Sequence, residues 1–180
     1  EAGPIPATTV SVDANNANEE GPFSPERTGS LPCGQLAELI HSGRLPNWAS
    51  AKTFLHREGG VSAYLGTNDL VEVERRIAAG DQAAAEVLDA MAYQVAKAIG
   101  AYATVLSGRV DAILITGGAA HSTILTEAII DRIGWIAPVR VHPGEDELTA
   151  LAEGAGRVLA GEETPRDYAS SIITTDQEHA

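Results

Sequence analysis

Cysteine is almost absent from this 180-residue chain, which has only Cys33. A single thiol excludes a disulfide within the chain and a cysteine metal cluster, and it fits a reducing compartment. We expect Cys33 to be a small packed side chain. No apolar run approaches the length of a bilayer-spanning helix, and the first residues, EAGPIPATT, do not resemble a signal peptide. The sequence therefore predicts a cytoplasmic protein with no membrane partner.

Basic residues are also scarce: 12 lysines and arginines stand against 25 aspartates and glutamates, for a formal net charge of -13. This charge repels nucleic acids and anionic membranes, so neither is expected as a partner. An anionic ligand would need local positive groups. The hydrophobic content of 44% is sufficient for a sizeable core, and we expect one large domain or a domain with an appendage.

The most informative stretch is residues 111–122, DAILITGGAAHS. Its apolar run ILI predicts a short strand that is buried on both faces of a sheet. Gly117 and Gly118 then allow a sharp turn and a close approach of a ligand to the backbone, and Ser122 can cap the helix that follows.

A strand, a glycine turn and a helix start have two interpretations. In an open α/β sheet they place backbone N–H groups and the positive end of a helix dipole where nucleotides and phosphates bind. An ordinary turn between a strand and a helix has the same pattern, and neither GxGxxG nor GxxxxGK[ST] is present. The local pattern leaves both interpretations open.

Apolar spacing and helix-end residues predict the other elements. The region 59–66 is expected to be a turn, and Asp69 and Glu72 fit a D-x-x-E capping box, so Asp69 is a helix cap first and a ligand contact second. We expect strands at 10–13 and 139–141, and helices at 33–43, 48–58, 69–80, 81–108, 123–133 and from about 145 to 159.

Arg27 lies in a loop, residues 15–32, that is rich in asparagine, glycine and proline. Three prolines stiffen this loop, so the arginine has less entropy to lose, and a guanidinium can grip phosphoryl or carboxylate oxygens in a planar fork. Pairing of Arg27 with Glu26 or Glu19 on the surface is the alternative.

Glu145, Asp146 and Glu147 fall on the first turn of the last predicted helix. The helix macrodipole stabilises acids there, which is reason enough for their presence. The functional alternative is that one of them holds a magnesium ion, because such ions take carboxylates together with substrate phosphate oxygens.

Three segments together resemble the acetate and butyrate kinase family, in its butyrate kinase branch: GPFSPERTGSLP, IGAYATVLSGRVDAILITGGAAHS and HPGEDELTALAEGAGRVL. The similarity runs from Val10 to Leu159 in the family's order. It implies an α/β fold, an actin-like, ribonuclease H-like ATPase domain with a mixed sheet flanked by helices. Residues 1–160 are then the C-terminal nucleotide-binding domain, residues 161–180 are a tail, and the family's N-terminal domain has no counterpart here.

The resemblance also implies a reaction. The γ-phosphoryl group of ATP is transferred reversibly to butanoate, with Mg²⁺, giving butanoyl phosphate and ADP. Arg27 matches the family arginine that contacts the transferring phosphoryl group. Glu145 and Glu147 are the candidates for the acid associated with the metal, and Glu147 is preferred.

The nucleotide contacts implied by the resemblance lie in two places. Gly117 and Gly118, with Ala119 and Ser122, match the loop that receives the adenosine part of the nucleotide. Asp69 falls where related acetate kinases place an aspartate near the ribose or base.

The resemblance further implies a homodimer, and a chain that binds nucleotide weakly and does not turn over without the N-terminal half of the enzyme. Acetate, propionate or a branched-chain acid could replace butanoate, because the missing half forms much of the acyl site. A protein of a different class, a stand-alone nucleotide-binding or interaction module without catalysis, is the alternative.

Overall fold

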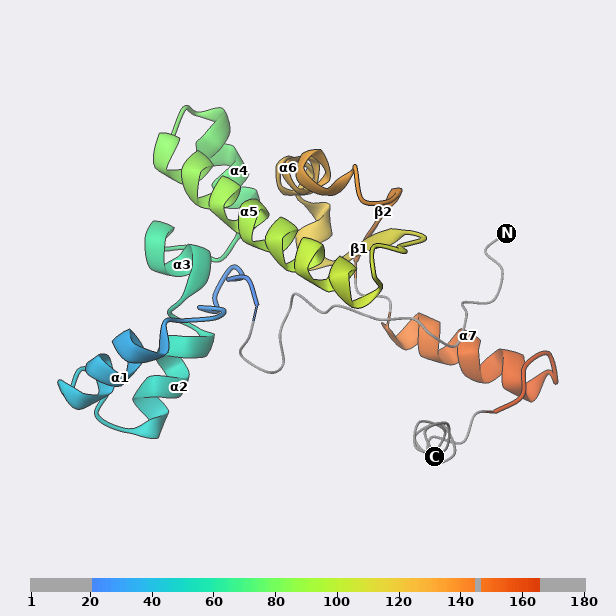
Figure 1. Cartoon of the computed structure of the whole chain (residues 1–180), viewed down its shortest axis with the longest axis horizontal. Coiled ribbons are helices and arrows are strands. Elements are labelled where there is room, and N and C mark those ends of the chain that lie inside the picture. The colour runs from blue at the N-terminus through green and yellow to red at the C-terminus, as the bar shows by residue number, and fades with distance from the viewer. Residues whose placement is uncertain (1–20, 145–146, 166–180) are drawn as a thin grey trace. The chain divides into compact units, whose positions relative to one another are not determined.

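The computed structural model describes residues 21–144 and 147–165 (Figure 1). Contacts divide the chain into two units, the first ending at residue 144, whereas the boundary predicted from the sequence is residue 160. The first unit contains, in order, α1 Cys33–His41, α2 Trp48–His56, α3 Gly60–Leu65, α4 Leu70–Ala78, α5 Gln82–Val105, β1 Ile113–Gly117, the 3-10 helix η1 Gly118–His121, α6 Thr123–Ile133 and β2 Val139–Pro143. The second unit contains α7 Glu147–Leu159.

Every helix and strand predicted within the described residues is present, and the predicted strand 10–13 lies outside them. One α-helix of the described residues was not predicted: α3 occupies part of the predicted turn at 59–66. Gly59 is its N-cap, and Gly66 ends it in the left-handed conformation, with φ of 72°. Six residues between two glycines are too few to show a helical period, so the glycines dominated the prediction.

The core of the first unit is organised around α5. Helices α3, α4 and α6 all pack against it, as Figure 1 shows. Its buried face consists of Ala84, Leu88, Met91, Ala92 and Ala96. The long core helix predicted from apolar spacing is therefore confirmed, and its small residues let the neighbouring helices approach closely.

Strands β1 and β2 are parallel, with Ile113 opposite Val139 and Gly117 opposite Pro143. Ile113 faces the core, but Leu114 is 58% exposed. The prediction that this strand is buried on both faces is therefore wrong. Successive side chains of a strand point to opposite faces, and the described residues cover only one face of the two-stranded sheet.

Helix α1 lies at the surface and has no buried residue. Cys33, its first residue, is exposed, so the expectation of a packed cysteine is wrong. The apolar residues of α1 do not reach the core that α5 organises, and the thiol consequently faces solvent. No helix among the described residues combines the length and the apolar character that crossing a membrane requires.

Candidate functional site

β1 ends in the paired-glycine turn that the sequence singles out. Gly117 has φ of 84°, a conformation that side chains rarely adopt, so the turn requires glycine there. The Gly117 N–H donates to the Gly144 carbonyl at 3.1 Å, and the Gly144 N–H donates back at 3.2 Å. Among the described residues, and apart from the adjoining backbone, no atom lies within 4 Å of the position that a Cβ on Gly118 would occupy. A ligand can therefore approach the backbone closely at Gly118.

Ser122 is the N-cap of α6, as predicted. Its hydroxyl oxygen accepts a hydrogen bond from the Leu125 N–H at 3.2 Å, and the hydroxyl donates to Oε1 of Glu74 at 2.5 Å. Ser122 is only 4% exposed. Because its proton goes to Glu74, Ser122 serves the turn by fixing the helix start, and the neighbouring backbone is the better contact for a ligand.

Glu74 changes the electrostatics of this turn. Its carboxylate accepts from Ser122 at the N-terminus of α6, where the positive end of the helix dipole stabilises an anion. The Glu74 carboxylate would repel a phosphate group at this place, whereas it would not repel a neutral ribose or base. The glycine turn itself remains open, so the geometry suits the neutral part of a nucleotide better than its phosphates.

Asp69 caps α4, and its carboxylate accepts from the Val71 N–H at 2.9 Å. The predicted cap is confirmed, but the predicted capping box is wrong. The Asp69 N–H donates to Oγ1 of Thr67 at 3.2 Å, and Glu72 forms an ion pair with Arg75 at 2.7 Å. In a capping box the Glu72 side chain would accept from the Asp69 N–H, but Thr67 already accepts from that N–H. Arg75, one turn after Glu72, binds the Glu72 carboxylate instead.

The contact between Glu74 and Ser122 brings α4 to the start of α6, although the two residues are 48 positions apart. Asp69, which is exposed, lies five residues before Glu74, about 7.5 Å along the helix axis. The structure thus places the helix that Asp69 caps beside the glycine turn. Glu74 was missed by the sequence analysis, because no local pattern marks a residue whose partner lies on a distant element.

The loop that carries Arg27 is held by backbone hydrogen bonds rather than by its prolines alone. The Ser24 N–H donates to the Arg27 carbonyl at 3.2 Å, and the Arg27 N–H donates to the Ser24 hydroxyl at 3.1 Å. The Gly59 N–H donates to the Glu26 carbonyl at 3.1 Å, and the Thr28 N–H donates to a carbonyl at the end of α2 at 3.0 Å. This geometry supports the interpretation that Arg27 is rigidly positioned.

The loop and the turn are anchored by different elements. The N–H groups of Val61 and Ser62 in α3 donate to the Ser24 and Pro25 carbonyls, and the Phe23 N–H donates to Oε1 of Gln94 in α5 at 3.2 Å. The turn is anchored by β2 and α4. Helix α5, on which α3, α4 and α6 all pack, is the element common to both sets.

The predicted metal ligands, Glu145 and Glu147, belong by sequence to the second unit. Glu145 falls outside the described residues, and Glu147 is the first residue of α7. Their role therefore stays a prediction. Within the described ranges, no three or more histidine, cysteine, aspartate or glutamate side chains are grouped so that they could hold a metal ion.

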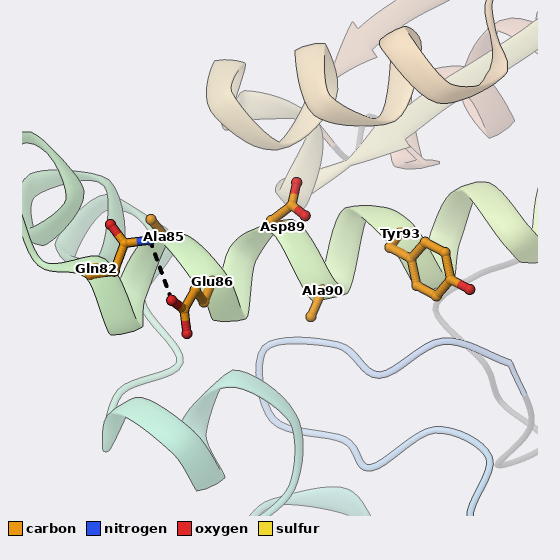
Figure 2. A pocket seen from close by; sticks show the side chains of 6 residues that line it. All are labelled: Gln82, Ala85, Glu86, Asp89, Ala90 and Tyr93. Carbon is orange, nitrogen blue, oxygen red and sulfur yellow. Dashed lines mark hydrogen bonds between the residues drawn. The ribbon is translucent and has the colours of Figure 1, made fainter.

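A pocket follows one face of α5, and Figure 2 shows the side chains around it. Its carboxylates have partners: Glu86 accepts from Gln82 at 3.3 Å, and Asp89 accepts from Arg132 at 2.6 Å. None of the predicted site residues lines it. The lining residues are Gln82, Ala85, Glu86, Asp89, Ala90 and Tyr93.

Residues 26–179 match the family model described as the acetokinase family. The chain is 54% identical over 157 residues to probable butyrate kinase 2 of Caldanaerobacter subterraneus subsp. tengcongensis. That alignment covers 87% of this chain and 44% of the relative. The chain therefore spans less than half the length of this curated relative.

Solved structures of similar fold include acetate kinase from Porphyromonas gingivalis, with a TM-score of 0.65 and 22% identity, over 74% of this chain and 40% of that one. Acetate kinase from Entamoeba histolytica gives a TM-score of 0.64 and 16% identity, over 77% of this chain and 43% of that one. At these identities the similarity establishes the fold alone, and it confirms the predicted actin-like fold. The described residues contribute its two parallel strands and their flanking helices.

Proposed function

We propose that this chain, which belongs to the acetokinase family, is the C-terminal nucleotide-binding half of a carboxylate kinase. The observation that carries the proposal is the 54% identity with probable butyrate kinase 2. We infer butanoate as the acceptor, with butanoyl phosphate and ADP as products. Acetate, propionate and a branched-chain acid are the competing acceptors. Because the chain spans 44% of that relative, we expect turnover to need the N-terminal half of the same enzyme.

The proposed nucleotide site is the glycine turn. Gly117 and Gly118 expose the backbone, Ala119 continues it in η1, and Ser122 fixes the start of α6. Asp69, exposed at the start of α4, is the proposed contact for the ribose or base. The Glu74 carboxylate at the helix start supports an adenosine moiety at this turn, with the phosphates of ATP or ADP directed away from it.

Phosphoryl transfer needs positioning and charge neutralisation more than covalent chemistry. An oxygen of the acceptor carboxylate attacks the γ-phosphorus while the bond to the β–γ bridging oxygen breaks, and ADP leaves with that electron pair. The acceptor is already an anion, so the step needs no general base. Arg27 is proposed to neutralise charge on the transferring group. Mg²⁺, held through Glu145 or Glu147, would supply further neutralisation of the phosphate oxygens.

A kinase assay on the complete enzyme tests this proposal, with acyl phosphate trapped as the hydroxamate. We expect acyl phosphate from ATP and butanoate, and no turnover by the 180-residue chain alone. Arg27→Gln should lower kcat by about 10²- to 10³-fold, because one charged stabiliser of the transition state is lost. Arg57→Gln, an exposed arginine after α2, is the matched control and should leave kcat unchanged.

Three results would contradict parts of the proposal. Turnover by the chain alone would contradict the need for the N-terminal half, and full activity of Arg27→Gln would contradict the role of Arg27. Failure of the complete enzyme to phosphorylate any of the four acids, with ADP binding retained, would favour a nucleotide-binding module without catalysis.

Two further expectations concern the state of the protein in the cell. A homodimer is supported by the large apolar side chains exposed on α1 and α2, Ile40 and Trp48. Light scattering during size-exclusion chromatography would detect it. A cytoplasmic location is supported by the single free cysteine and by the proposed use of ATP.

A further inference from the structure

Glu74 connects α4 to the segment that follows the glycine turn. Its Oε1 atom accepts a hydrogen bond from the Ser122 hydroxyl, with 2.5 Å between the two oxygens, and the same hydroxyl oxygen accepts one from the Leu125 N–H at 3.2 Å. These two hydrogen bonds link Glu74 in α4 to Ser122 and Leu125 at the start of α6. Ser122 is nearly inaccessible to solvent, so water competes poorly for these bonds.

The contact between Glu74 and Ser122 fixes how α4 and α6 lie relative to each other. Both α4 and α6 pack on α5, and the bond between Glu74 and Ser122 joins α4 directly to the start of α6. Asp69 begins α4, and Gly117 and Gly118 precede α6. A nucleoside that touches both places requires a fixed separation between them. A short bond to a carboxylate suits this purpose, because charge-assisted hydrogen bonds are among the stronger ones in proteins.

We propose that Glu74 is a positioning residue, which holds Asp69 and the Gly117–Ser122 turn at the separation that the adenosine part of the nucleotide requires. This inference rests on the proposed nucleotide function. Glu74 would make no contact with the reacting atoms and would act through Ser122.

Glu74→Gln keeps an acceptor oxygen of similar reach, whereas Glu74→Ala removes the hydrogen bond to Ser122. Comparing the two variants therefore shows whether this hydrogen bond, rather than the negative charge, is what matters.

The first experiment measures ADP affinity of the full 180-residue chain by titration calorimetry. Glu74→Ala should weaken ADP binding about tenfold, the effect of losing a hydrogen bond to a charged group. Glu74→Gln should recover most of the affinity. Glu72→Ala is the matched control, because Glu72 lies on the same helix and its carboxylate pairs with the exposed Arg75. It should bind ADP as the unmodified chain does.

The second experiment needs no nucleotide. Hydrogen–deuterium exchange of the amides of residues 118–125 should accelerate in Glu74→Ala and stay unchanged in Glu72→Ala, if the carboxylate holds this segment. Unchanged exchange would refute the link itself. Faster exchange with undiminished ADP affinity would refute the positioning role while leaving the nucleotide function intact. Absence of ADP binding by the unmodified chain would instead refute the nucleotide site on which the inference rests.

Discussion

Gly60 offers the sharpest test of how the Arg27 loop is held. It has φ of 58°, and a Cβ built on it would lie 1.8 Å from the Ser24 carbonyl oxygen and 2.8 Å from the Arg27 carbonyl oxygen. Both neighbours are backbone atoms, so no side chain can rotate away to make room. Gly60→Ala must therefore displace either the start of α3 or the loop that positions Arg27.

The expected loss of stability in Gly60→Ala is the sum of two separate effects. A left-handed backbone costs a residue with a Cβ about 1–2 kcal/mol, and overpacking adds about 1–3 kcal/mol. Gly60→Ala should therefore lower the free energy of unfolding by about 2–5 kcal/mol. Gly66, at the other end of α3, is the matched control: its φ is 72°, but no atom of the described residues outside the adjoining backbone lies within 4 Å of its Cβ position. Gly66→Ala should show only the conformational part, about 1–2 kcal/mol.

Urea unfolding of the 180-residue chain, followed by circular dichroism, measures both values. The complete enzyme carrying Gly60→Ala should also lose kinase activity if the displaced loop carries the proposed phosphoryl-binding arginine. Equal destabilisation by Gly60→Ala and Gly66→Ala would show that the close approach of α3 to the loop is wrong, and with it the account of how Arg27 is held.

Two further predictions concern the core and a helix cap. Leu88 is 2% exposed and Leu114 is 58% exposed, so Leu88→Ala should lower the free energy of unfolding by about 2–5 kcal/mol and Leu114→Ala by at most about 0.5 kcal/mol; similar urea midpoints for both would contradict the burial. The N–H of Ala84 and then Arg76 lower the pKa of Asp81 below its ordinary value. The carboxylate therefore stabilises the fold above the unfolded pKa of about 3.9, and this contribution disappears as pH falls through the lower, folded value. The melting-temperature advantage over Asp81→Asn should shrink below about pH 4, and an advantage that stays constant down to about pH 2 would contradict this assignment.

Helix starts were predictable because capping is local. Asp69, Asp81 and Ser122 each accept a hydrogen bond from an N–H two or three residues later, as helix-start patterns predict. The capping box failed within the same short range, because Arg75 competed for Glu72. The choice between two nearby partners depends on side-chain geometry that the pattern does not contain.

The candidate site was only partly predictable. The sequence pointed to the glycine turn, and Gly117 does adopt the conformation that only glycine tolerates easily. The roles of Arg27 and of the acids at 145 and 147 rest on resemblance to the family and stay predictions. Glu74 was not foreseen, because its partner lies 48 residues away.

The sequence by itself determined where most of the described helices and strands form, that Asp69 and Ser122 cap their helices, and to which family the chain belongs. These properties depend on neighbouring residues or on the order of motifs. Only the tertiary structure decided that Gly144 pairs with Gly117, that Glu74 holds Ser122 and that Leu114 remains exposed. Each of these depends on which elements, far apart in the sequence, pack together, and a local sequence pattern does not specify those contacts.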